Sequence, residues 1–273
     1  MWRDPAGVTW DARWPETEEA LRVVQAVLGS HAAAVRRSQT WIPGSRPLVG
    51  GCFVTFARER AAGGLSRTHA FAAAVAWRPP ASLREHAEPY RHSDGALRGS
   101  RDAPRRARDL EDQVVAEARV AAPYVPGLLA LRHGAVLAEA VARLRVLPDV
   151  LLVNATGVDH PRGAGLALHL GAMLGLPTVG VTHRPMLASG ALPESVRGRT
   201  SPVMLDDEIV GCWVCTRSGA RPVLAHAAWR TTPETAACIA LLASTQAART
   251  PVPLQEARRV AREARALAEG RGG

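Results

Sequence analysis

The sequence predicts an α/β fold in which helices flank a mixed β-sheet. Segments typical of strands come first and in hairpin order, and later ones alternate with helical segments. Hydrophobic residues make up 47% and charged residues 22% of 273 residues, which is enough for a sizeable core. The length suits one large domain or two small ones, and the order of the elements favours one.

The N-terminal part is predicted to be an arm followed by a long helix. Residues 1–15 hold three of the seven tryptophans, and we expect this arm to dock aromatic side chains on a surface, a mobile terminus being the alternative. Thr17 is followed by two glutamates and then by apolar residues every three or four positions. This pattern predicts a capped amphipathic helix over residues 17–38.

Two strands and an insertion are expected next. Residues 47–56 are typical of a largely buried strand, and residues 68–77 are typical of its hairpin partner across a glycine-bearing turn. Residues 79–112 are polar and rich in arginine, so we expect an exposed insertion. It could act as a flap over an anion, but a solvated loop is the favoured interpretation.

The rest of the chain alternates between strands and helices. A turn, Pro123-Tyr-Val-Pro-Gly127, separates a strand from a helix. The strands are expected at 113–121, 149–153, 177–181, 209–216 and 221–226, and the helices at 128–147, 163–175, 233–244 and 254–269. The main domain is therefore predicted to span residues 16–250, with a C-terminal helix and tail at 251–273.

The charge of the chain favours an anionic partner. Its 34 basic residues exceed its 25 acidic residues, which gives a formal charge of +9, and all 34 are arginines. The absence of lysine excludes a Schiff-base lysine, a lysine general base and a phosphate-loop lysine. Either a small anionic molecule or a nucleic acid fits this charge.

Membrane and disulfide-rich classes are not expected. No uninterrupted apolar run approaches the length of a membrane span, and residues 1–14 do not resemble a secretory signal. Four dispersed cysteines do not form a disulfide framework and fit a reducing cytoplasm. We therefore expect a cytoplasmic protein with no membrane partner.

Most residues with catalytic potential lie in the segment 154–165, which leaves a buried strand and enters a helix. Ligands bind at this edge of open α/β sheets, where backbone N–H groups are unpaired. Gly157 and Gly165 would let the backbone approach a flat ligand. Asp159 and His160 could each act as an acid, a base or a ligand, with a capped loop and a structural histidine as the alternative.

Two further histidines lie next to arginines. His133 follows Arg132 on the helix after the turn, and His183 precedes Arg184 at the end of a strand. His169 lies inside an apolar helix and is expected to be a core residue. The role of His226, at a strand end, stays open.

A series of motifs resembles the endonuclease V family. The motifs run in the family's order and spacing between about residues 19 and 247, apart from the insertion at 79–112. They are Pro123-Tyr-Val-Pro-Gly-Leu-Leu-Ala-Leu-Arg132, Pro148-Asp-Val-Leu-Leu-Val153, His160-Pro-Arg162, His169-Leu-Gly171 and Leu176-Pro-Thr-Val-Gly-Val181. The resemblance implies a ribonuclease H-like α/β fold, with residues 16–250 as an endonuclease V-like domain.

The resemblance also implies how a base would be bound. In that family the segment around Tyr124 is a wedge that enters nucleic acid, and the backbone around the following glycine holds an everted hypoxanthine. The matching residues are Gly127 and Leu129, with Gly157 and Gly165. Arg132, Arg162 and Arg184 are expected to bind an anionic group.

The family's metal chemistry is not expected to carry over. The resemblance implies Mg²⁺ held by three carboxylates with a histidine nearby. The first carboxylate position falls on Phe53, the second on His133 and the third on Asn154. The histidine position falls on Trp229, although His226 would match if the loop were longer. The chain is therefore expected to be a divergent member without the catalytic residues, to bind no metal and to need no cofactor.

Three interpretations of the function follow. The favoured one is a repurposed, metal-independent enzyme or enzyme subunit that acts by elimination, cyclisation or group transfer on a small anionic or nucleoside-like substrate, as in specialised metabolism. Its catalytic residues would be His133, Asn154, Asp159, His160 and His183. The alternative is a non-catalytic binder of nucleic acid with a deaminated or unpaired base.

The third interpretation, a transition-metal enzyme using His133, His160 and His183, is the least favoured of the three. An active endonuclease V that cuts near inosine with Mg²⁺ is also less favoured than the first two interpretations. The tryptophans of the arm and the C-terminal tail leave room for a partner protein subunit.

Overall fold

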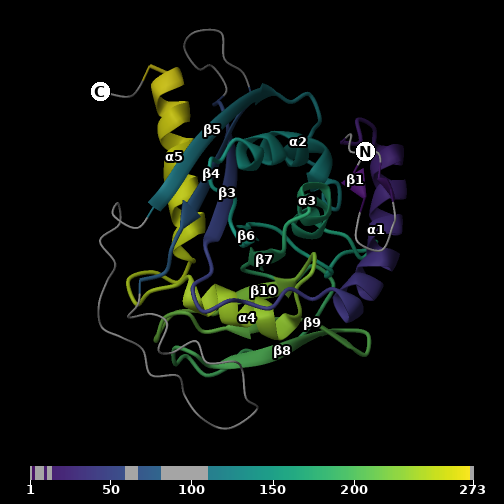
Figure 1. Ribbon diagram of the computed structural model, residues 1–273, viewed down its shortest axis with the longest axis vertical. Helices are drawn as coiled ribbons and strands as arrows, with labels where there is room; N and C mark the ends of the chain where they lie inside the picture. The colour runs from purple at the N-terminus through teal and green to yellow at the C-terminus, as the bar shows by residue number, and fades with distance from the viewer. Residues whose placement is uncertain (1, 4–8, 11–13, 59–66, 81–109, 271–273) are drawn as a thin grey trace.

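A computed structural model of the chain describes residues 2–3, 9–10, 14–58, 67–80 and 110–270. An eight-stranded mixed sheet with the order β5-β4-β3-β6-β7-β10-β9-β8 forms its centre, and Figure 1 shows helices on both faces. The predicted helix-flanked mixed sheet is thereby confirmed. No helix of the described part of the chain is long and apolar enough to cross a membrane.

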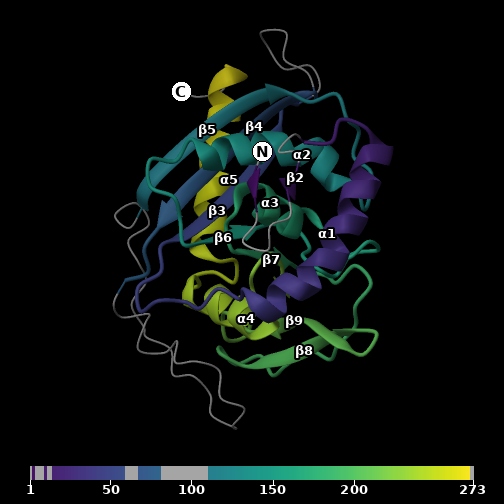
Figure 2. The same cartoon turned by 45° about the vertical axis from the view of Figure 1, so that its right-hand side comes forward.

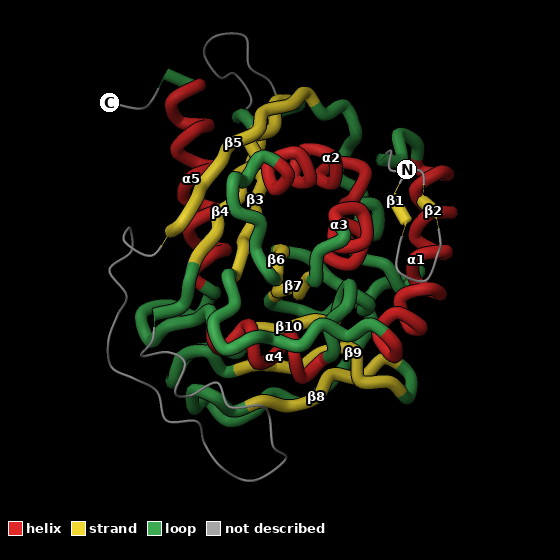
Figure 3. Tube along the Cα trace, viewed as in Figure 1, coloured by secondary structure: helices red, strands yellow, loops and turns green. Residues whose placement is uncertain are grey.

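The parallel centre of the sheet consists of β3 (Val49–Phe56), β6 (Val150–Val153) and β7 (Thr178–Thr182). The flanking strands pair antiparallel: β4 (His69–Trp77) and β5 (Leu110–Arg119) on one side, and β10 (Val223–Ala227), β9 (Glu208–Val214) and β8 (Thr200–Leu205) on the other. Figure 3 shows β5 and β8 as the two outer strands.

Three helices cover one face of the sheet. They are α1 (Glu18–Ser38), α2 (Leu129–Ala142) and α3 (Leu166–Leu174). Their apolar side chains share one core with Cys52, Leu151 and Val153. Figure 2 shows α1 running diagonally across the side that also carries α2 and α3.

Two helices cover the other face. α4 (Pro233–Leu242) packs with Leu152, Val179 and Val181, and α5 (Val252–Ala268) packs with Ala73 and Val75 of β4. Buried residues thus alternate between the two faces along each central strand, as the two-residue repeat of a strand requires.

α1 begins where the sequence predicts it. The Thr17 side chain accepts a hydrogen bond from the Ala20 N–H at 3.2 Å and caps the helix. Within the arm, β1 (Trp2–Arg3) pairs with β2 (Thr9–Trp10), a pairing that the sequence does not predict. Trp14 stacks on His169 with the ring centroids 4.7 Å apart, so this tryptophan docks on the α3 layer.

The structure differs from the predicted boundaries in three places. β5 begins at Leu110, so the last residues of the predicted insertion 79–112 belong to a strand that pairs with β4. Residues 81–109 of that insertion lie outside the described residues. The predicted helix 128–147 ends at Ala142, and β8 is an additional strand. β8 carries Pro202, which is tolerated at the edge of a sheet and weakens the strand pattern.

Candidate functional site

The strands β3, β6, β7 and β9 end at one edge of the sheet. Cys52 of β3 lies beside Val153 of β6 in parallel register, so Phe53 and Asn154 follow side by side. β7 ends at the same edge and is followed by the exposed His183 and Arg184. β9 is antiparallel to β10, which is antiparallel to β7, so β9 also ends here.

Trp229 does not join this group. It follows β10, which runs against β7, and its carbonyl oxygen accepts a hydrogen bond from the Thr178 N–H at 3.0 Å. Thr178 begins β7, so Trp229 lies at the opposite edge from Asn154 and is only 1% exposed. The four positions singled out by the resemblance therefore do not form one cluster.

The donor set at this edge does not fit Mg²⁺. Phe53 offers an aromatic ring, and the guanidinium carbon of Arg258 lies 5.7 Å from the ring centroid. Asn154 offers one neutral amide, whereas Mg²⁺ prefers carboxylate oxygens. The residues described by the structure contain no group of three or more His, Cys, Asp or Glu that could hold a metal. His133, His160 and His183 are thus not gathered as the transition-metal interpretation requires.

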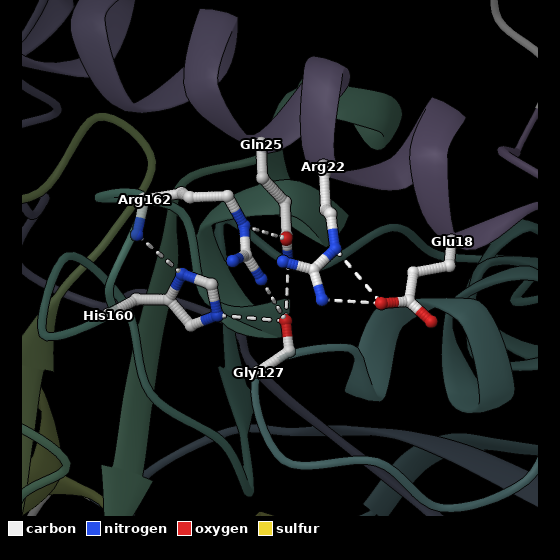
Figure 4. A network of polar contacts seen from close by, with 6 residues as sticks. All are labelled: Glu18, Arg22, Gln25, Gly127, His160 and Arg162. Atoms are coloured by element: carbon white, nitrogen blue, oxygen red, sulfur yellow. Dashed lines mark hydrogen bonds and ion pairs between the residues drawn. The ribbon is translucent and has the colours of Figure 1, made fainter.

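The carbonyl oxygen of Gly127 receives three hydrogen bonds from side chains. Gln25 Nε2 donates at 3.2 Å, Arg162 Nη2 donates at 2.8 Å, and His160 Nε2 lies at 3.1 Å (Figure 4). Gly127 adopts a φ of +77°, which favours glycine. Because these donors come from α1 and from the loop after β6, the turn before α2 is fixed from two sides. Tyr124, earlier in this turn, is 67% exposed.

His160 uses both ring nitrogens in this network. Its Nδ1 accepts from the Arg162 N–H at 3.2 Å, so the proton resides on Nε2, which donates to Gly127. Burial lowers the pKa of His160 to about 4, although the hydrogen bond to Gly127 opposes the shift. At neutral pH the ring is an uncharged donor that positions the turn. Neither nitrogen is free to act as the predicted catalytic base.

Gln25 is a site residue that sequence reasoning missed. Its Oε1 accepts from Arg162 Nε at 2.8 Å, and the residue is 1% exposed. The signal was a polar residue on the buried face of α1, between Leu21 and Leu28. Such a residue needs hydrogen-bond partners when it is buried. The adjacent ion pair of Arg22 with Glu18 is half-exposed (Figure 4).

Arg132 fixes the same turn from the other end. Its guanidinium donates to the carbonyl oxygens of Ala122 and Arg67, and it lies 3.9 Å over the ring of Phe56. His133 lies against the same ring, with centroids 5.5 Å apart. Burial, followed by the charge of Arg132, lowers the pKa of His133 to about 4. Arg132 is therefore engaged in holding backbone rather than open to a ligand.

Asp159 anchors the loop after β7. It is fully buried, and its carboxylate accepts from the N–H groups of Met186 at 2.7 Å, Leu187 at 2.8 Å and Ala188 at 3.0 Å. Nδ1 of the buried His226 lies 3.8 Å away. Burial lowers the pKa of His226 to about 4 against the attraction of Asp159. Asp159 thus holds the loop after β7 through its backbone N–H groups. This is the kind of structural role that the sequence indicated as the alternative to a catalytic one.

Gly157 and Gly165 are required by close packing of the chain. A Cβ at Gly157 would lie 2.0 Å from the carbonyl oxygen of Ala227, and one at Gly165 would lie 2.4 Å from that of Thr156. Leu129 is half-buried on the first turn of α2, next to the fixed turn at Gly127. Of the predicted base-binding residues, Tyr124, Gly127 and Leu129 therefore lie together.

His183 lies in a positive environment. Its pKa is lowered, first by burial and then by the charges of Arg249, Arg258 and Arg221. These arginines come from the segment before α5, from α5 itself and from the segment before β10. The sheet edge that holds Asn154 and His183 is thus surrounded by guanidinium groups.

Comparison with known proteins identifies relatives of the chain. The sequence model of a family described as Endonuclease V matches residues 104–259. Endonuclease V of Roseiflexus castenholzii is 41% identical over 126 residues, which cover 46% of this chain and 56% of that protein. The chain therefore aligns with little more than half the length of this relative.

Solved structures match over nearly the whole chain. The crystal structure of endonuclease V from Streptomyces avermitilis has 30% sequence identity and a TM-score of 0.72, with 98% of each chain covered. A variant of Ciona intestinalis endonuclease V, in complex with a 23mer DNA that contains an inosine, has 17% identity and a TM-score of 0.66. It covers 92% of this chain and 99% of that one. At this identity, the second match shows the fold alone.

These matches contradict the favoured functional prediction. The sequence suggested a repurposed, metal-independent enzyme for a small anionic or nucleoside-like substrate, and the family match together with relatives named as endonucleases shows that prediction to be wrong. That prediction rested mainly on the four positions at which the family's catalytic residues are substituted: Phe53, His133, Asn154 and Trp229. The structure separates one of them from the rest and places the predicted residues Arg132, Asp159, His160 and Arg162 in positioning roles.

Proposed function

Because this chain belongs to the endonuclease V family, we propose that it acts on nucleic acid at a strand that carries a deaminated purine such as inosine. The Ciona relative was solved with inosine-containing DNA, and this substrate class is carried over here as a proposal. The formal charge of +9 supports an anionic polymer as the partner.

The observation that carries the proposal is the fixed turn at Gly127. Gln25, His160 and Arg162 converge on its carbonyl oxygen, while Tyr124, in the same turn, is 67% exposed. A rigid loop with an exposed aromatic ring is suited to enter a base stack and hold an extruded nucleotide. The three hydrogen bonds to the Gly127 carbonyl oxygen hold the turn in one conformation before a strand binds. Such preorganisation lowers the entropic cost of binding.

A binding experiment tests this proposal. Fluorescence anisotropy with labelled 20-nucleotide strands, alike except for one inosine or one adenosine, gives the two dissociation constants. We expect tighter binding of the inosine strand and loss of that preference in Tyr124→Ala. The isosteric control Tyr124→Phe should retain the preference, because stacking depends on the ring. Equal affinity of the wild-type chain for both strands would refute the proposal.

The same samples report on strand cleavage. Denaturing gels of the bound strands, with and without Mg²⁺, show whether the phosphodiester near the inosine is broken. Cleavage is the reaction in the names of the relatives, and the donor set at the sheet edge offers no three-carboxylate site for the metal among the described residues. A product next to the inosine would extend the proposal from recognition to catalysis.

A further inference from the structure

An arginine-rich cleft lies between α5 and the segment that precedes it. Its volume is about 740 Å³, and its lining includes five arginines and one carboxylate, Glu263. The arginines are Arg217, Arg249, Arg258, Arg259 and Arg262. This concentration of one charge in a concave surface raises the local concentration of anions.

Four of these arginines have no ion pair with a described carboxylate: Arg217, Arg249, Arg258 and Arg262. Arg259, by contrast, is paired with Glu256 at 2.8 Å and with Glu263 at 2.7 Å. Arg217, Arg258 and Arg262 are exposed, and Arg249 is half-buried. Since like charges repel, an anion bound between them would lower the electrostatic cost of their convergence.

The cleft adjoins the sheet edge described above. α5 runs alongside β3: a Cβ at Gly51 would touch Pro253, and Arg265 Nη1 donates to Thr55 Oγ1 at 3.1 Å. Arg258 lies over Phe53 at this edge, and Arg217 follows the end of β9. After burial, the charges of Arg249 and Arg258 contribute to the lowered pKa of His183 at this edge.

We propose that this cleft binds consecutive phosphates of the nucleic-acid strand, with guanidinium groups supplying the positive charge at an edge whose residues do not fit Mg²⁺. This inference rests on the proposed function, which identifies the bound polymer as a nucleic acid. Arginine suits this role because its planar, permanently charged group pairs with phosphate through two parallel N–H donors. Arg258 and Arg262 are one helical turn apart, so both face the cleft.

The salt dependence of binding tests the cleft. Each phosphate contact that is lost should reduce the slope of log K against log salt concentration by about 0.7 for a single strand. We expect this reduction in Arg258→Gln and in Arg262→Gln, with several-fold weaker binding and no change when EDTA is added. Thermal unfolding of each variant verifies that it is folded.

Arg143→Gln is the matched control, because it removes the same charge. Arg143 directly follows α2 and forms an ion pair with Glu139 of that helix. The chain then leads into the beginning of β6, so Arg143 lies toward the opposite edge of the sheet from the cleft. Its slope should equal that of the wild type. Cleft variants with the same slope as Arg143→Gln would overturn the inference.

The outcomes for the cleft and for base recognition are separable. If the wild type prefers inosine but the cleft variants keep its salt slope, the cleft inference fails and the proposed function stands. If the slopes fall but no inosine preference exists, the cleft binds a strand and the proposed function fails. Loss of binding on addition of EDTA would show that a metal supplies the charge and would also overturn the inference.

Discussion

The network at Gly127 makes a quantitative prediction for Arg162→Ala. This change removes two hydrogen bonds of 2.8 Å, one to the Gly127 carbonyl oxygen and one to Gln25 Oε1. A hydrogen bond to a charged group contributes about 1.5–3 kcal/mol. The guanidinium is partly solvated, and in the variant water can form hydrogen bonds with the partners that Arg162 leaves. We therefore expect a combined loss of about 1–2 kcal/mol in the free energy of unfolding.

A double-mutant cycle with Gln25→Ala isolates the shared part of this loss. Gln25 also donates to Gly127 at 3.2 Å, so each single variant already breaks the bond between Gln25 and Arg162. The double variant should therefore lose less stability than the sum of the singles, by about 0.5–1 kcal/mol. Urea unfolding followed by circular dichroism measures all four corners of the cycle.

The same variants should weaken binding of the inosine strand. If the turn is loosened at a cost of about 1 kcal/mol, affinity falls about fivefold. Arg143→Ala, which removes the same charge from an exposed ion pair, should leave both stability and affinity within error. Strict additivity of the two single variants, or an unchanged affinity in Arg162→Ala, would refute the positioning role assigned to this network.

Three further predictions concern the core. Asp159→Asn changes a buried carboxylate that accepts from three backbone N–H groups, and it should lower the free energy of unfolding, measured in urea, by about 2–3 kcal/mol. The exposed Asp207→Asn should cost under about 0.5 kcal/mol, and a small loss at Asp159 would contradict its anchoring role. His169 is buried, neither ring nitrogen has a hydrogen-bond partner among the described residues, and burial lowers its pKa to about 4. The unfolded chain therefore binds a proton first, so the stability contributed by the neutral ring is lost as pH falls from about 6.5 to about 4. His169→Phe should flatten unfolding curves measured across that pH window, and an unaltered pH dependence would show that other groups cause it. Gly134→Ala places a Cβ 2.2 Å from the Trp14 ring and should shift tryptophan fluorescence to the red as the ring is displaced, while Gly44→Ala, which has open space, should not; identical spectra would contradict the docking of Trp14.

Local patterns predicted the fold well. The capping threonine and the apolar repeat located α1, and the short apolar run before Asn154 located β6. The strand β8 was not predicted, because its proline, Pro202, and the polar residues before it do not give the alternation of apolar residues that is typical of a strand. The strand order was not predicted, because it depends on pairings between segments far apart along the chain.

The roles of the site residues depended on partners far along the chain. Gln25 and Gly127 are 102 positions apart, and Arg162 is 137 positions from Gln25. A sequence shows that histidines and arginines are present, but not whether their nitrogens are already occupied. Asp159, His160, Arg132 and Arg162 were therefore candidates for chemistry, and the structure shows each of them bonded to backbone.

The position of α5 has a consequence for when the protein becomes able to bind its partner. Arg258 and Arg262 come from α5, while Phe53 lies in β3, and Asn154 and His183 directly follow β6 and β7, all of which are synthesised earlier. Domains fold as units and N-terminal segments emerge first, so the cleft forms only after α5 has left the ribosome. If the cleft binds phosphates as proposed, the growing chain would lack this surface until α5 has emerged from the ribosome.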